Sequence, residues 1–173
     1  NDGETVDTVT TTASSVPFGT INVSTMYQGC LKTSITTNAA NGFTIRTRED
    51  HSLRTGGGAT IPDADCDASG CLNTPSTAAA FTVAGSGNGL GISCFHDATS
   101  TSCSTSDPNW NNGNNWAPIG NESVGQTPAK YAGLTGATSV EVITKAKFRL
   151  RAPASQGAGT YTNQVSFIAT PVF

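Results

Sequence analysis

Apolar and charged side chains alternate along residues 140–151, and this alternation constrains the fold more than any other feature of the chain. A period of two is that of a β-strand with one face buried and the other in water. The sequence therefore predicts a long strand with an exposed basic row. The even-numbered positions, expected on the buried face, are Val140, Val142, Thr144, Ala146, Phe148 and Leu150. The odd-numbered positions, expected on the exposed face, are the charged residues Glu141, Lys145, Lys147, Arg149 and Arg151, and the apolar Ile143 is the exception.

Shorter alternating runs predict further strands, two of them on either side of a turn signal. Residues 31–37 and 43–48 alternate in the same way, and Asn41-Gly42 lies between them. An Asn-Gly pair between two such runs favours a tight β-hairpin. No window of the sequence shows helical periodicity. Further strands are expected at residues 18–23, 79–83, 90–95 and 160–170.

The composition fits a single all-β domain. The chain has 173 residues and a net charge of −3, and its charged fraction is 12%, against roughly 25% in an average soluble domain. Because the chain is mildly acidic and carries few charged residues, a nucleic-acid partner is disfavoured. No apolar run approaches the ~18 residues of a membrane span. Residues 56–125 are rich in Gly, Asn and Ser, which predicts a loop-rich insertion within a domain over residues 17–173.

Five cysteines indicate an oxidising compartment. Cys66 with Cys71 and Cys94 with Cys103 are spaced for two short-range disulfides, each pinning a loop poor in apolar residues. The spacings differ from the pairs that zinc prefers, so no metal is expected there. Cys30 is left over, and burial in a strand is favoured over a bond to a neighbouring molecule. Because the chain begins without a leader sequence, we expect a secreted, extracellular protein whose signal peptide has been removed.

No sequence motif predicts catalysis. Phosphate-binding loops, nucleophile elbows and paired zinc-ligand motifs are absent, so we expect neither an enzyme nor a cofactor. His51 follows Asp50, but adjacent side chains of a strand point apart, which disfavours a catalytic couple. Asp63, Asp65 and Asp67 alternate as the first ligands of a calcium loop do, although the Gly and Glu that should follow are missing. They form a weak calcium candidate, with a solvated acidic turn as the alternative.

Two patterns predict contacts with carbohydrate. Trp110 and Trp116 flank an Asn-rich run, and indole and amide side chains together suit a sugar-binding face. The alternative is that one Trp closes the end of the domain while Asn and Gly form turns. Asn22 and Asn121 begin glycosylation sequons. Because Asn22 falls in a predicted strand, Asn121 is the better candidate.

The N-terminal arm, residues 1–16, has the composition of a strand that adds to another sheet. Residues 4–16 contain neither Gly nor Pro and are rich in β-branched side chains. Val6 and Val9 have opposite parity, so the apolar side of such a strand is shallow. Acidic residues near the start of the arm complement the basic row of residues 145–151. The candidate donor-strand residues are Thr5, Val6, Val9, Thr11, Ala13 and Val16.

Three short motifs, two in the first 45 residues and one near the C-terminus, are informative together. Residues 17–20 read Pro-Phe-Gly-Thr, residues 42–45 read Gly-Phe-Thr-Ile, and residues 158–167 read Ala-Gly-Thr-Tyr-Thr-Asn-Gln-Val-Ser-Phe. In these segments the chain resembles the spore-coat-U-like family of secreted bacterial pilins, and biofilm-matrix fibre proteins with jelly-roll subunits are similar. Residues 50–130 are unlike the family. The resemblance implies an incomplete Ig-like or jelly-roll β-sandwich that polymerises by donor-strand complementation, in which the arm of one subunit fills a groove of the next.

Together these features predict a structural subunit of an extracellular filament or pilus-like fibre for adhesion or biofilm. Its partner is another copy of the chain, with surface glycans or neighbouring filaments as further contacts, and the basic row of residues 145–151 lies on the acceptor side. Head-to-tail addition does not close, so it yields a filament. Two alternatives are a monomeric adhesin or carbohydrate-binding module that uses Trp110 and Trp116, and a subunit of a virion or surface-layer shell.

Overall fold

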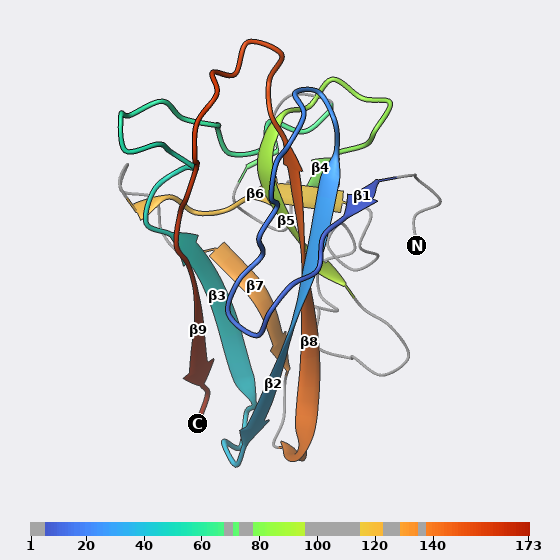
Figure 1. Cartoon of the computed structure of the whole chain (residues 1–173). Helices are drawn as coiled ribbons and strands as arrows, with labels where there is room; N and C mark the ends of the chain where they lie inside the picture. The colour runs from blue at the N-terminus through green and yellow to red at the C-terminus, as the bar shows by residue number, and fades with distance from the viewer. Residues whose placement is uncertain (1–5, 68–70, 73–77, 96–114, 123–128, 135–137) are drawn as a thin grey trace.

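The computed structural model describes residues 6–67, 71–72, 78–95, 115–122, 129–134 and 138–173, and the regular elements in these ranges are all β-strands (Figure 1). No helix in this part of the chain is long and apolar enough to cross a membrane. The strands are β1 (Asp7–Thr8), β2 (Tyr27–Thr37), β3 (Phe43–Glu49), β4 (Ala79–Ala80), β5 (Gly89–Phe95), β6 (Asn115–Pro118), β7 (Ala129–Leu134), β8 (Thr138–Arg151) and β9 (Val165–Pro171).

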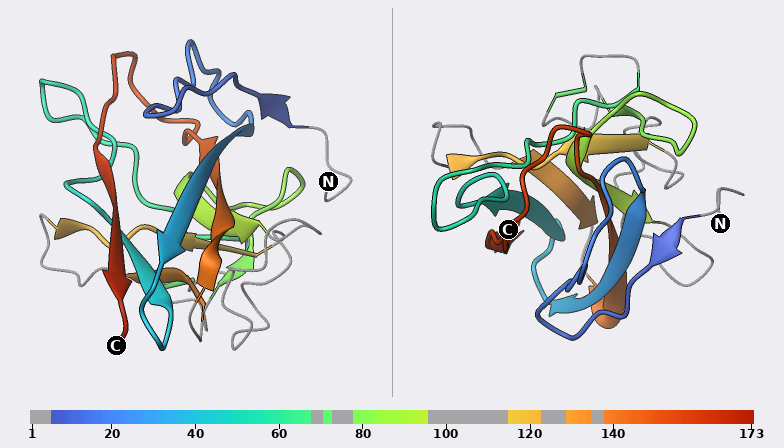
Figure 2. Two further views of the ribbon diagram at one scale, coloured as in Figure 1. Left: turned by 90° about the horizontal axis from the view of Figure 1, so that it is seen from below. Right: turned by 45° about the horizontal axis from the view of Figure 1, so that its top comes forward.

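The strands form two sheets around a shared core (Figure 2). One sheet has six strands in the order β1-β2-β8-β5-β6-β4, and the other has three in the order β7-β3-β9. The antiparallel pair of β2 and β8 runs from Tyr27 opposite Leu150 to Thr37 opposite Thr138. Phe148 of β8 contacts Phe167 of β9 edge to face, with ring centroids 6.3 Å apart. The all-β prediction is confirmed.

The predicted strand over residues 140–151 is confirmed as β8, but its charged face is not uniformly wet. Val142, Ala146, Phe148 and Leu150 face the shared core as expected. On the opposite parity, Lys147 and Arg149 are only 5% and 1% exposed. A second apolar cluster covers Arg149, whose guanidinium lies 4.6 Å from the ring centroid of Trp116. The cluster consists of Met26, Ala64, Cys66, Cys71, Phe81 and Trp116.

The hairpin predicted at Asn41-Gly42 is wrong. The runs on either side are indeed strands, but β2 belongs to the six-stranded sheet and β3 to the three-stranded one. The turn therefore carries the chain from one sheet to the other. Gly42 adopts a φ of 83°, which a side-chain-bearing residue seldom adopts, and its N–H donates to Ala39 O at 3.1 Å.

Other elements differ from the expectation. Residues 18–23 form no strand, β4 has only two residues, and the last strand begins at Val165. β6 and β7 were not predicted. Within the region expected as a loop-rich insertion, β4, β5 and β6 complete the six-stranded sheet.

Candidate functional site: an apolar groove between the sheets

Within the described ranges, two strand edges on one side of the molecule lack a neighbouring strand along most of their length. β2 pairs with β8 along its length, whereas its other edge pairs with β1 only at Tyr27 and Gln28. In the described part of the chain, β9 pairs with β3 alone. Such edges present main-chain N–H and C=O groups that can bind a further strand.

An apolar groove lies between these two edges. It has a volume of about 1050 Å³, and side chains of the shared core form its floor: Leu31, Leu53, Ile61, Leu90, Phe148 and Leu150. Residues 14–23 form one wall and residues 156–165 the other. A second hollow of about 210 Å³ is lined by Ile35 of β2 and Ala169 of β9, among others. Phe167 lines both hollows, so they follow the same gap along β9.

Hydrogen bonds hold the wall that leads into β9. Gln156 N–H donates to Pro153 O at 3.0 Å, which closes a turn after β8. The Tyr161 hydroxyl donates to Gly157 O at 2.7 Å and accepts from Gln156 Nε2 at 2.6 Å. Arg54 and Thr162 exchange two main-chain bonds of 3.1 and 3.0 Å. The segment that precedes β9 is thus held by bonds within itself and by its pairing with Arg54.

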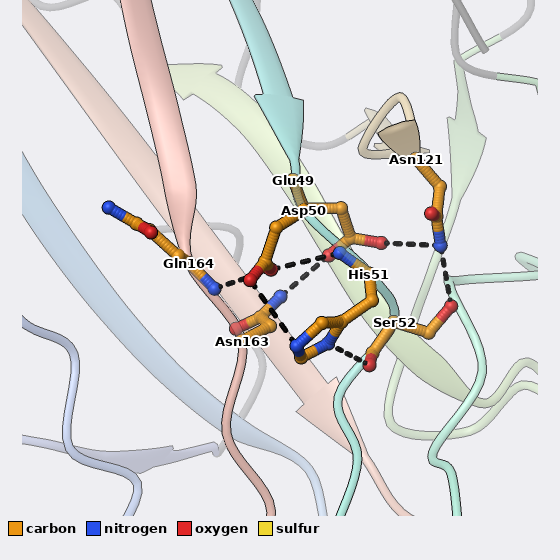
Figure 3. Close-up of polar contacts among 7 residues, drawn as sticks. All are labelled: Glu49, Asp50, His51, Ser52, Asn121, Asn163 and Gln164. Atoms are coloured by element: carbon orange, nitrogen blue, oxygen red, sulfur yellow. Dashed lines mark hydrogen bonds and ion pairs between the residues drawn. The ribbon is translucent and has the colours of Figure 1, made fainter. Parts of the chain in front are cut away.

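A buried carboxyl group ties the same wall to β3 (Figure 3). Glu49 is 1% exposed, and its Oε2 accepts from Asn163 Nδ2 at 2.6 Å while Oε1 accepts from Asn121 Nδ2 at 3.4 Å. Burial, together with a hydrogen bond and the negative charge of Asp63, raises the pKa of Glu49 to about 10. Glu49 therefore holds a proton at neutral pH. The signal for its burial was available, because Glu49 has the inward parity of Phe43 and Ile45.

Asp50 and His51 do contact each other, contrary to the expectation from strand geometry. They lie in a bend after β3, and His51 Nε2 is 3.3 Å from Asp50 Oδ2. The other ring nitrogen, Nδ1, lies 2.9 Å from the main-chain oxygen of Ser52. The Ser52 hydroxyl oxygen accepts instead from Asn121 Nδ2 at 2.8 Å. The imidazole thus bonds to the main chain of Ser52, and these contacts hold the loop after β3 in place.

The predicted tryptophan pair does not form an exposed sugar-binding face. Trp116 is fully buried in the second cluster, in edge contact with Phe81 and beneath the guanidinium of Arg149. Trp110 lies outside the described residues. The alternative interpretation, in which one Trp packs inside the domain, fits Trp116.

The expectation of a fully exposed basic row is wrong for Lys147 and Arg149, which are buried, whereas Lys145 and Arg151 are half-buried. Arg149 Nε donates to Gln28 Oε1 at 2.9 Å, and its Nη1 donates to Phe81 O. Arg151 donates to Val83 O at 2.8 Å and to Gly85 O at 2.6 Å. These arginines join β8 to the segment after β4.

The three aspartates of the weak calcium candidate do not converge, and no group of three or more metal-ligating side chains occurs among the described residues. Asp67 accepts from Thr82 N and Oγ1 at 2.7 and 2.6 Å, and Asp65 accepts from Asn88 N at 2.6 Å. Asp63 is the partner of Glu49. Each carboxylate serves a different part of the structure.

Cysteines and sequons bring one confirmation and two corrections. The Cys66–Cys71 disulfide is confirmed; Cys94 is also disulfide-bonded, and its expected partner Cys103 lies outside the described residues. Cys30 lies in β2 with an exposed, free thiol, so its expected burial is wrong. Asn121 is 3% exposed and hydrogen-bonded, whereas Asn22 is exposed in a loop. The order of preference between the two sequons is therefore reversed in the folded chain.

The N-terminal arm lies against its own subunit. β1 pairs in parallel with the start of β2, and Val6 packs against the second cluster. Val16 packs against the shared core at the groove. Of the candidate donor-strand residues, Thr5 lies outside the described part of the chain and Ala13 is exposed.

No family model, no curated protein and no solved structure matches the chain. The resemblance to secreted pilins thus rests on its short motifs alone.

Proposed function

We propose that the chain is the structural subunit of an extracellular filament, in which the N-terminal arm of one copy inserts into the groove of the next. The observation that supports this most is the groove itself, with an apolar floor between two strand edges. An inserted strand gains main-chain hydrogen bonds from an edge and places alternate side chains in the hollows. On this proposal the two sheets form an incomplete β-sandwich of the Ig-like or jelly-roll type.

The donor and the acceptor match in chemistry. Residues 4–16 contain no Gly or Pro and several β-branched side chains, which suit an extended strand. The groove is lined mainly by aliphatic and aromatic side chains, with Thr and Ser at its rim. Because each copy carries both a donor and an acceptor, addition is head to tail and a filament results. Extracellular assembly in adhesion or biofilm is the corresponding role.

Electron microscopy of negatively stained protein tests the proposal. The intact chain should form filaments, and a version that lacks residues 1–16 should not. Filaments from both versions, or monomers from both, would refute donor-strand assembly. Closed particles would favour the shell subunit instead.

A substitution on β9 separates the groove from general effects on folding. Ala169→Trp places an indole in the second hollow, whereas Thr170→Trp is the matched control, because alternate residues of a strand face opposite sides. Both positions are exposed, so neither change removes a buried side chain. We expect Ala169→Trp alone to prevent filament formation.

A further inference from the structure

The arm has a defined seat on its own subunit. Asp7 N–H donates to Met26 O at 3.1 Å, and Val9 N–H donates to Gln28 O at 2.9 Å. Beyond this pairing, the Thr11 hydroxyl donates to Cys30 O at 2.7 Å. These three bonds occupy successive main-chain acceptors on the edge of β2 that borders the groove. In the unassembled chain, the arm already covers part of that edge.

Val6 and Val9 point to opposite faces of the six-stranded sheet, and both side chains are packed in this docked position. Val6 packs against the second cluster, on the outer side of the six-stranded sheet. Val9 lies on the inner side, where its Cγ2 would be 3.0 Å from a Cβ at Gly29. A strand that plugs a groove buries one parity only. The spacing of the two valines therefore fits an arm that crosses the edge of its own sheet.

The end of the arm also closes the groove. Ser14, Ser15 and Val16 line it and are followed in the same wall by Phe18 and Ile21. Figure 1 shows this segment crossing in front of β2 and rising on the side of β9. The segment that serves as the donor strand is thus continuous with the wall that covers the acceptor.

We propose that the arm, docked on β2 of its own subunit, is a cap that keeps the unassembled chain latent, and that its release both frees the donor strand and opens the groove to a second copy. This inference rests on the proposed filament function and adds its regulation. The arm can detach from β2 at low cost, because β1 pairs over two residues only and most side chains of residues 6–16 are exposed. Only the released fraction can join, so that fraction scales the rate of assembly.

Gly29→Ala in the full chain removes the seat without changing the arm. The added methyl carbon would lie 2.5 Å from Val16 Cγ1, closer than two non-bonded carbon atoms approach, so we expect Val16 and the arm to shift. Gly29 does not belong to the groove lining. Gly56→Ala is the control, since a Cβ there meets open space.

Two measurements on the full chain decide the proposal. In dilute, unassembled protein, hydrogen exchange of residues 6–16 should be roughly tenfold faster or more in Gly29→Ala, because the local opening is favoured. The lag before light scattering rises should shorten with it, while Gly56→Ala matches the parent. Unchanged exchange overturns the seat, and faster exchange with an unchanged or longer lag overturns the regulation. If the parent never assembles, the filament function and its regulation both fail, whereas the exchange data still decide the docking.

Discussion

Glu49 shows how a single buried acid makes the stability of this domain depend on pH. With its pKa raised to about 10 by burial and by Asp63, the folded chain keeps the Glu49 proton that the unfolded chain releases near pH 4.5. Between these values folding takes up a proton, so this group disfavours folding more and more as the pH rises. Asp50 adds a further negative charge nearby and acts in the same direction.

Glu49→Gln should therefore stabilise the protein relative to the parent, and increasingly so from pH 5 to pH 9. The Gln amide can donate to Asp63 as the protonated acid does and still accept from Asn163, but it has no proton to lose. Urea unfolding at several pH values measures the difference. Glu122→Gln is the control, since Glu122 is exposed in an ion pair with Arg48. Parallel pH profiles for Glu49→Gln and the parent would contradict the assignment.

At the scale of elements, β8 shows what its alternation could and could not predict. The strand and its apolar face followed from local periodicity, because a period of two fixes which side chains share a face. Burial of Arg149 did not follow from it, because that burial depends on the cluster around Phe81 and Trp116, which comes from distant segments. The Asn41-Gly42 turn was misassigned for a similar reason. A tight turn is a local signal, whereas the sheet to which each strand belongs is decided by long-range pairing.

Arg149 joins β8 to β2 and to the second cluster, so Arg149→Lys should loosen that side of the sheet. Lys keeps the charge but lacks the planar fork that bonds Gln28 and Phe81 while lying over Trp116. We expect a loss of roughly 2–3 kcal/mol in the free energy of unfolding, the scale of hydrogen bonds to a charged group. Urea denaturation measures it. Arg48→Lys, at an exposed ion pair, should change stability by less than about 1 kcal/mol, and equal effects at both positions would argue against the joint.

For the whole molecule, the groove is a property that no single segment displays. Its floor combines residues from β2, β5 and β8 with Leu53 and Ile61, isolated apolar residues in turn-rich sequence. The donor strand, by contrast, is contiguous, and its composition was readable directly. The sequence therefore supported a prediction of an added strand, while the groove that we propose as its acceptor is visible only in the arrangement of the two sheets.

A polymer in which every joint has one donor and one acceptor has two different ends, and this gives a last prediction. A chain without residues 1–16 has no donor but keeps the apolar floor of the groove, although it lacks residues 14–16 of one wall. It can therefore join one end and stop growth there. At one truncated chain per ten intact chains, the mean filament length should fall to about ten subunits. The Ala169→Trp chain should stop growth at the opposite end, because it keeps the arm and lacks room in the second hollow. Filament lengths measured by electron microscopy that do not depend on either ratio would mean that the copies join through another surface.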